Sequence, residues 1–136
     1  MKIFITLDDK NGMAFNKRRQ SRDAVLNRKI AELIGENPLF MSAYTEKLFD
    51  EIKIEKSVSE NFLELASKDD FCFVEDKDVP IEKCEKLFIF RWNRVYPADR
   101  FFNHDLTSNG FILESSEEFV GSSHEKITLD IFTKGE

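Results

Sequence analysis

Residues 86–102 read KLFIFRWNRVYPADRFF, an apolar run that passes directly into a polar and aromatic loop. The run from Leu87 to Phe90 has no polar residue at either alternating position, which predicts a strand covered on both faces in the middle of a sheet. If the strand continued past Arg91, charged and aromatic side chains would alternate on its two faces as far as Tyr96. Ligands usually bind at the carboxyl ends of strands in open α/β sheets, so this loop is the first candidate for a functional site.

The bulk composition is that of one globular domain. The chain has 136 residues and a formal net charge of -6, and a chain of this length buries about two-thirds of its unfolded surface. No apolar run approaches the roughly 18 residues of a membrane span, and residues 2–7, KIFITL, are typical of a strand rather than of a signal peptide. We therefore expect a single domain over residues 1–136, located in the cytoplasm and without a membrane association.

The cysteines and histidines do not form a metal-binding pattern. Cys72 and Cys84 lie in or beside apolar runs and are expected to be buried free thiols. His104 and His124 are the two histidines of the chain, which is too few for a His/Cys metal site. We predict neither a metal ion nor a cofactor.

The acidic net charge is unevenly distributed. Residues 16–30 carry six basic side chains against Asp23 alone, whereas residues 32–82 carry fourteen acids against five lysines. Most of the surface should repel phosphate, so general binding of nucleic acid is not expected. A local site for an anion remains compatible with the basic segment.

Hydrophobic patterning predicts strands interleaved with helices. The best helix prediction runs to Ile34, with Ser21 as its N-cap, Asp23 in its first turn and Gly35 at its end. Ser122 and Glu125 fit a capping box, so residues 125–133 are compatible with a short helix as well as a strand, and the strand is favoured. Strands are expected at residues 2–7, 39–42, 71–74, 87–90, 111–113 and 127–131. Shorter helices are expected at residues 45–51, capped by Thr45, at residues 59–66, capped by Ser59, and at residues 80–85.

The order of these elements is similar to that of the dihydrofolate reductase family, and Asp23 lies near the family's pterin-binding carboxylate. Residues 5–16, ITLDDKNGMAFN, resemble the family's first strand and its Gly-Met loop. Residues 37–49 resemble the strand and helix around its Gly-Arg-x-Thr segment, and residues 86–90 with 98–102 resemble a late strand and a Gly-Asp-x-x-Phe loop. The resemblance covers most of the chain. It implies an α/β fold of one domain, a mixed β-sheet flanked by helices with an antiparallel carboxyl-terminal hairpin.

Several positions depart from that family's pattern. The family has Gly-Gly after the middle strand, whose backbone amides approach the cofactor pyrophosphate, but this chain has Glu75 and Asp76. Residues 17–22, KRRQSR, replace a Trp-x-x-Pro region, and Phe90 stands where threonine is expected. Residues 54–71 are too few for the usual extra strand and helix. These departures imply a scaffold of that fold on which the carboxylates of Glu75 and Asp76 would repel a dinucleotide.

A second resemblance is to a small bacterial group whose members often carry the name ribonuclease Z. It rests on residues 91–99, RWNRVYPAD, and on residues 121–128, GSSHEKIT. The name implies RNA cleavage with two metal ions held by His-x-His-x-Asp-His, a motif that two isolated histidines cannot build. An RNA-processing nuclease would lose its activity in Arg91→Ala or Asp99→Ala.

The loop after residue 90 contains a possible anion receptor. Arg91, Asn93 and Arg94 could bind a carboxylate or phosphate in a planar, bidentate manner, with the ring of Trp92 or Tyr96 as a stacking surface. The alternative, which is favoured, pairs these arginines with Asp99 and other acids, because charges near a buried strand end are costly unless they are paired.

The basic segment before the first helix is the other candidate. Arg18, Arg19 and Arg22 precede a helix N-terminus, where backbone amides and cations together favour an anion, although a solvated basic turn is favoured over a site. Asp23 could handle a proton if it were buried with a raised pKa, or it could be an ordinary first-turn acid. His124 is interpreted as a surface or structural histidine, because its sequence neighbours cannot face it as a catalytic triad requires.

These observations favour a binding or regulatory module on a dihydrofolate-reductase-like scaffold that has lost its dinucleotide site. Its partner would be a protein or a small anionic ligand gripped near the Arg91–Asp99 loop, and a basic protein would be steered by the acidic net charge. The first alternative is a small NADPH-dependent reductase that uses Asp23 as its proton relay, and the second is the nuclease. The expected ligand-binding residues are Arg18, Arg19, Arg22, Arg91, Asn93, Arg94, Tyr96 and Asp99.

Overall fold

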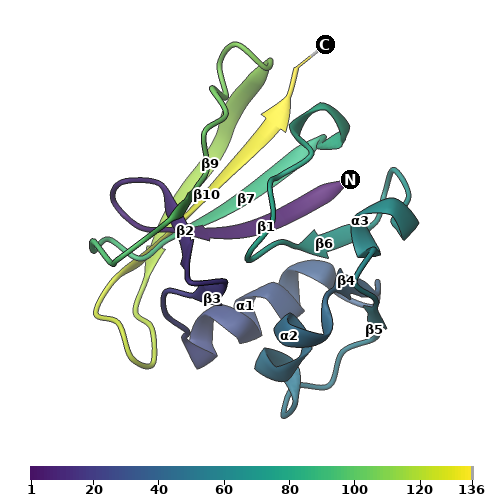
Figure 1. Ribbon diagram of the computed structural model, residues 1–136, viewed down its shortest axis with the longest axis horizontal. Coiled ribbons are helices and arrows are strands. Elements are labelled where there is room, and N and C mark those ends of the chain that lie inside the picture. Colours follow the sequence, from purple (N-terminus) through teal and green to yellow (C-terminus); the bar gives the residue numbers. More distant parts are fainter. Residues whose placement is uncertain (136) are drawn as a thin grey trace.

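A seven-stranded mixed β-sheet forms the centre of the computed structural model, which describes residues 1–135 (Figure 1). Strand β1 (Lys2–Leu7) pairs in parallel with β6 (Phe71–Phe73) on one side and with β7 (Lys86–Arg91) on the other. The strand order is β5-β4-β6-β1-β7-β10-β9. The remaining strands are β4 (Leu39–Met41), β5 (Lys56–Val58) and the antiparallel pair β9 (Phe111–Phe119) and β10 (Ile127–Lys134). The predicted fold class is confirmed, and residues 127–134 are a strand.

The alternation of side chains along the central strands divides the core into two halves. On one face, the ring of Phe4 lies 4.5 Å from that of Phe88, and both pack in the same cluster as the buried face of α1 (Ala24–Ile34). On the other face, Ile3 and Leu87 belong to a cluster that includes Phe62, the first residue of helix α3 (Phe62–Leu65). Both faces of the central strands are therefore covered, as their continuous apolar sequence predicts.

The helices other than α1 are short. They are α2 (Ala43–Glu46), which continues into η1 (Lys47–Phe49), α3 (Phe62–Leu65) and η2 (Ile81–Lys83). Residues 54–71 hold β5 and α3, a strand of three residues and a single helical turn. The segment predicted as a helix through residue 51 thus ends at Phe49, and the segment predicted at residues 80–85 contains one short 3-10 turn.

The predicted N-caps were wrong by a few residues. Asp23, not Ser21, caps α1, because its Oδ1 accepts hydrogen bonds from the backbone N–H groups of the first turn. Ser42, not Thr45, caps α2, and Thr45 is buried within that helix. Helix α3 begins after Asn61, so Ser59 does not cap it.

A second, three-stranded sheet joins the segments that flank the carboxyl end of β1. It is composed of β2 (Gly12–Phe15), β3 (Arg18–Arg19) and β8 (Arg100–Phe101). The two residues between β2 and β3, Asn16 and Lys17, have φ of 51° and 61°, which is typical of a tight hairpin turn. The basic segment is therefore part of a β-hairpin, which we did not predict.

The parallel strands β1, β4, β5, β6 and β7 have their carboxyl ends at the same edge of the main sheet (Figure 1). Strand β7 ends at Arg91, and Asn93 has a φ of 61°, so the strand alternation does not extend toward Tyr96. Of the helices in residues 1–135, none combines the length and the apolar character that a membrane span needs.

Candidate functional site

A buried ion pair closes the edge of the sheet where β6 ends. Glu75 follows β6 and is 7% exposed. Its two carboxylate oxygens accept hydrogen bonds from Nε (2.8 Å) and Nη2 (3.0 Å) of Arg19, which lies on β3. The hydroxyl of Thr45 donates a third hydrogen bond to Glu75, at 2.9 Å. The guanidinium of Arg19 also lies over the ring of Tyr44, 4.1 Å from its centroid.

The positive charge of Arg19 and the negative charge of Glu75 neutralise each other, without an external ion. Burial would lower the pKa of Arg19, but the hydrogen bonds and charge of Glu75 raise it, so the guanidinium stays protonated. The side chains of Arg19 and Glu75 are 16% and 4% exposed. Arg19 is therefore committed to an internal carboxylate rather than to an external anion.

Asp8 organises the turn after β1 and was missed by the sequence analysis. It is 2% exposed. It accepts hydrogen bonds from the backbone N–H groups of Gly12 (2.7 Å) and Tyr96 (3.1 Å) and from the side-chain amide of Gln20 (3.0 Å). Burial alone would raise the pKa of Asp8, but these hydrogen bonds outweigh it and lower the pKa. The Asx-turn pattern of residues 8–12 is the sequence signal that could have revealed this role.

Asp23 is buried at the start of α1 and is held as a carboxylate. Besides capping the helix, it accepts hydrogen bonds from the backbone N–H groups of Ser122 (3.0 Å) and Ser123 (2.9 Å) in the β9–β10 loop. Burial raises its pKa, but these bonds, His124 and the N–H of Leu26 outweigh that effect and hold the pKa well below its usual range. The raised pKa that a proton-relay role requires is therefore not found.

His124 is buried, at 9% exposure, and does not lie on the surface. Its Nδ1 lies 3.0 Å from Oδ2 of Asp23, and its Nε2 lies 2.9 Å from Oγ of Ser21 and 3.3 Å from the hydroxyl of Tyr96. Its ring stacks on that of Trp92, with centroids 4.6 Å apart. No local pattern could reveal these contacts, because the partners are distant in sequence.

The predicted receptor after β7 does not converge. Arg91 pairs with Asp130 of β10, at 2.7 Å, rather than with Asp99. The side-chain amide of Asn93 donates to the carbonyl of Lys126 and to the hydroxyl of Thr128. The carboxylate of Asp99 instead accepts a hydrogen bond from the backbone of the β2–β3 turn. Internal pairing, which was the favoured alternative, is therefore found for Arg91 but with a different acid. Arg94 forms no ion pair among residues 1–135, and its guanidinium lies 5.8 Å from the centroid of the Tyr96 ring.

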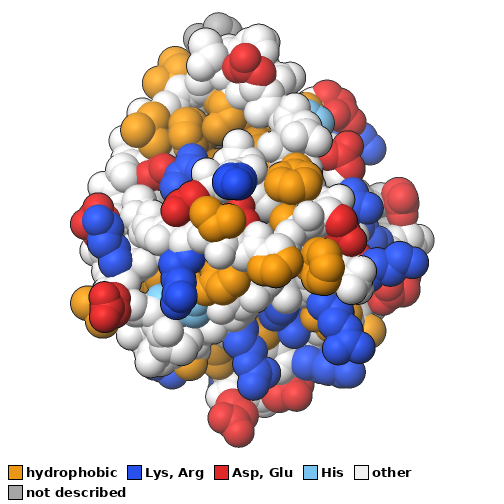
Figure 2. Space-filling view, turned by 60° about the vertical axis from the view of Figure 1, so that its left-hand side comes forward, with side chains coloured by type: hydrophobic (Ala, Val, Ile, Leu, Met, Phe, Trp, Pro, Cys, Tyr) orange, Lys and Arg blue, Asp and Glu red, His pale blue; other side chains and the backbone are white. Residues whose placement is uncertain are grey.

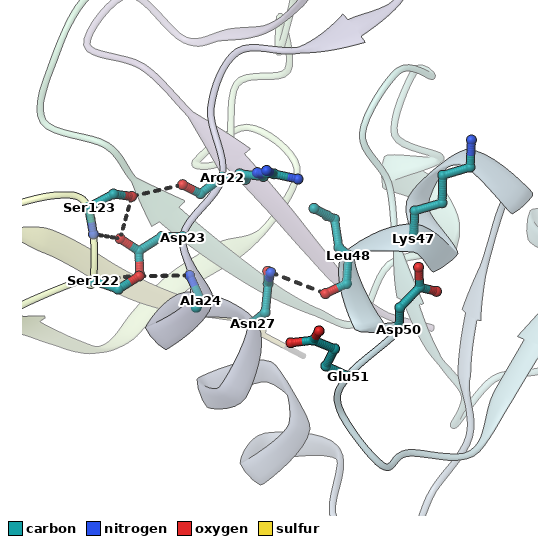
Figure 3. Close-up of a pocket in the computed structure, with 10 residues that line it drawn as sticks. All are labelled: Arg22, Asp23, Ala24, Asn27, Lys47, Leu48, Asp50, Glu51, Ser122 and Ser123. Atoms are coloured by element: carbon teal, nitrogen blue, oxygen red, sulfur yellow. Dashed lines mark hydrogen bonds between the residues drawn. The ribbon is translucent and has the colours of Figure 1, made fainter.

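Figure 3 shows a cavity of about 520 Å³ between the start of α1 and η1, which we call the α1 cavity. The side chain of Arg22 extends toward it, whereas the carboxylate of Asp23 turns toward the β9–β10 loop. Asn27 reaches across its base to the carbonyl of Leu48. Both acids and bases line it, so it has no clear preference for an anion. Its lining residues are Arg22, Asp23, Ala24, Asn27, Lys47, Leu48, Asp50, Glu51, Ser122 and Ser123.

A second cavity brings together the basic hairpin and the loop after β7. We call it the Tyr96 groove; its volume is about 670 Å³, and it is lined by Phe15, Asn16, Arg18, Arg19, Gln20, Tyr96 and Pro97. It contains three of the predicted ligand-binding residues. In Figure 2, hydrophobic and basic side chains lie interspersed over one face of the molecule, with basic side chains gathered toward its lower part.

A third cavity, of about 740 Å³, separates the loop after β7 from the β9–β10 loop. Asn93, Arg94 and His124 are among its lining residues, and we call it the His124 cleft. The predicted site residues are thus distributed over three cavities, and neither Arg91 nor Asp99 lines any of them. Among residues 1–135, no three His, Cys, Asp or Glu side chains are placed to hold a metal ion together.

Comparisons with known proteins give the fold. No protein-family model matches the chain, and no curated protein sequence matches it. Among solved structures, the chain is similar to dihydrofolate reductase from Enterococcus faecalis, in a complex with NADP(H) and RAB-propyl. The TM-score is 0.68 at 11% sequence identity, and the alignment covers 99% of this chain and 96% of that one. The chain therefore has a fold like that of dihydrofolate reductase.

Proposed function

We propose that this chain is a binding or regulatory module on a dihydrofolate-reductase-like scaffold that has lost its dinucleotide site. The observation that carries the proposal is the buried carboxylate of Glu75, held by Arg19 and Thr45 at the carboxyl edge of the sheet. In the family that the fold resembles, the corresponding Gly-Gly lets backbone amides approach a pyrophosphate. Here the two glycines are replaced by Glu75, whose side chain fills this position in its ion pair with Arg19, and by Asp76, so the residues present do not fit that group.

The Tyr96 groove is the part of the surface best suited to a ligand. Two arginines line this groove: Arg19 is paired with Glu75, whereas Arg18 forms no ion pair among residues 1–135 and is available to an external anion. Beside it lie the ring of Tyr96 and the ring of Phe15, which is 43% exposed. A planar ring that carries a phosphate or carboxylate would satisfy both features.

A protein partner would use the same region. The loop after β7 exposes the side chain of Val95 (55%), and β8 exposes that of Phe101 (40%). A positively charged partner would also be attracted by the net charge of -6. Such a complex would weaken as salt is added, because long-range attraction between exposed charges is screened.

Titration with NADPH by isothermal calorimetry tests the loss of the dinucleotide site. We expect no heat of binding at millimolar cofactor. Binding in the micromolar range would contradict the proposal and would favour the alternative, a small NADPH-dependent reductase. The fold and the position of Asp23 at the start of α1 favour that alternative, and Asp23→Asn would then abolish turnover.

The groove is tested with a panel of aromatic phosphates and carboxylates, with binding measured by ligand-detected NMR. We expect weak binding that falls with salt and is lost in Arg18→Glu. The matched control is Arg28→Glu, which changes an exposed arginine on α1 that does not line the groove. Equal losses in the two variants would show a general charge effect and would contradict a site in the groove.

A further inference from the structure

Three side chains that meet beside the N-terminus of α1 have the order of a serine hydrolase triad. Oγ of Ser21 lies 2.9 Å from Nε2 of His124, and Nδ1 of the same ring lies 3.0 Å from Oδ2 of Asp23. A nucleophile bonded to a base, and a base bonded to an orienting carboxylate, is the arrangement that activates serine in unrelated folds.

The surroundings fix the histidine in the tautomer that a general base requires. The carboxylate of Asp23 can only accept a hydrogen bond, so Nδ1 carries the proton that lies between them. Nε2 then presents its lone pair to the hydroxyl of Ser21. Stacking on Trp92, with 29° between the ring planes, holds the imidazole in this orientation.

Tyr96 supplies a hydrogen-bond donor for the oxyanion, the group that the triad itself does not stabilise. Its hydroxyl lies 3.3 Å from the same Nε2, so it approaches the histidine on the side where Ser21 lies. A phenolic O–H in this position can donate to the oxyanion that forms when serine attacks a carbonyl. Tyr96 also lines the Tyr96 groove together with Gln20, the residue before Ser21. Ser21 itself is half-buried rather than enclosed in the core.

We propose that Ser21 and His124 are the catalytic residues of an esterase centre in which Asp23 is the positioning residue. Oγ of Ser21 attacks the carbonyl carbon of a carboxylic ester while its proton moves to Nε2 of His124. The C–O bond to the alcohol breaks, the alcohol leaves with that proton, and an acyl-serine remains. Water then attacks the acyl carbon and gives a proton to Nε2 of His124. The bond between that carbon and Oγ of Ser21 breaks, His124 returns the proton to Oγ, and the acid leaves with no net gain or loss of electrons.

The class of substrate rests on the function proposed above for the Tyr96 groove, whereas the centre itself does not. A substrate acyl group would lie against the rings of Phe15 and Tyr96, and an anionic substituent would meet Arg18. We therefore expect esters of planar acids that carry a carboxylate or phosphate to be preferred over neutral esters of the same size.

Covalent labelling with a fluorophosphonate tests the centre without a need for the groove. We expect one phosphonyl adduct per chain, assigned to Ser21 by peptide mass spectrometry and absent from Ser21→Ala. The matched control is Ser108→Ala, which removes an exposed loop serine whose contacts are with Asp105. His124→Gln should slow labelling by about 100-fold or more, because the general base is removed. An unlabelled Ser21 in the folded wild-type protein would overturn the proposal.

Ester hydrolysis tests the proposed catalytic centre and the proposed substrate class separately. Wild-type protein should release a burst of one nitrophenol per chain from nitrophenyl esters, and Ser21→Ala should release none. Because Ser21→Ala removes a single hydroxyl from a half-buried side chain, we expect it to fold, and its circular dichroism checks this. A burst that is larger with anionic esters in the wild-type protein, but not in Arg18→Ala, supports both the catalytic centre and the role of the groove. A burst of equal size with anionic and neutral esters supports the centre and refutes the role of the groove. The absence of a burst refutes the centre.

Discussion

Replacement of Glu75 by glutamine removes one charge from the buried pair while keeping the volume of the side chain. The new amide places an N–H donor against the guanidinium of Arg19, which is left as an uncompensated charge with a side chain that is only 16% exposed. Breaking a buried pair in this way costs about 3–5 kcal/mol, and the residual exposure of Arg19 places Glu75→Gln at the lower end, near 3 kcal/mol. For a domain of this length, that corresponds to a fall in Tm of about 10 °C.

Urea unfolding followed by circular dichroism measures the effect, and an unchanged slope shows that the unfolding transition is comparable. The matched control is the next residue, Asp76→Asn, whose ion pair with Arg100 is far more exposed, at 25% and 42% for the two side chains. We expect a loss of less than about 1 kcal/mol for this control. The double variant Arg19→Met with Glu75→Gln should recover part of the lost stability, because no unpaired charge remains. Equal unfolding midpoints for Glu75→Gln and Asp76→Asn would refute the reasoning.

Further predictions concern the start of α1 and the thiols. The pKa of Asp23 is lower in the folded protein than its unfolded value of about 3.9, so Asp23 stabilises the fold above that pH, and this stability is lost as the pH falls toward the folded pKa. We expect Asp23→Asn to be about 2 kcal/mol less stable at neutral pH and to lose less stability on acidification, which urea unfolding at a series of pH values measures. Gly121→Ala should destabilise by more than about 1 kcal/mol in urea, because an added Cβ would collide with the carboxylate of Asp23. Burial raises the pKa of both Cys72 and Cys84 to about 12, so neither thiol should react with iodoacetamide at pH 8 until the protein is unfolded, which mass spectrometry can check.

The elements that sequence patterning predicted well are those whose structure follows from local composition. The run from Leu87 to Phe90 has no polar residue because both faces of β7 are covered, and this fixes a central strand without knowledge of its neighbours. The spacing of Leu26, Ile30 and Ile34 likewise fixes the buried face of α1. Strands β3 and β8 were missed because two residues are too few to show a period. Strand β3 depends on the turn at residues 16–17, and β8 depends on its pairing with the distant strand β2.

The candidate site was harder to predict because its contacts join distant segments. His124 reaches Asp23 and Ser21 only because β9 and β10 add to the far side of β7 and bring their connecting loop back to α1. The pairing of Arg91 with Asp130 depends in the same way on the register of β10 against β7, which no pattern in either strand specifies alone. The sequence predicts that charged side chains near a buried strand end have internal partners, but it does not identify those partners.

The register of β1 has a consequence for the order in which the chain can fold during synthesis. Lys2 is paired with Phe71 on one side and with Lys86 on the other. At about 5–20 residues per second, a ribosome needs roughly 4 to 17 seconds after making Lys2 to reach Lys86. This central strand is thus the first strand of the sheet to be synthesised, and both of its neighbours are present only after β7 has been made. A nascent chain stopped before β7 would leave this strand uncovered along one edge, which makes early termination products of this protein natural clients of chaperones.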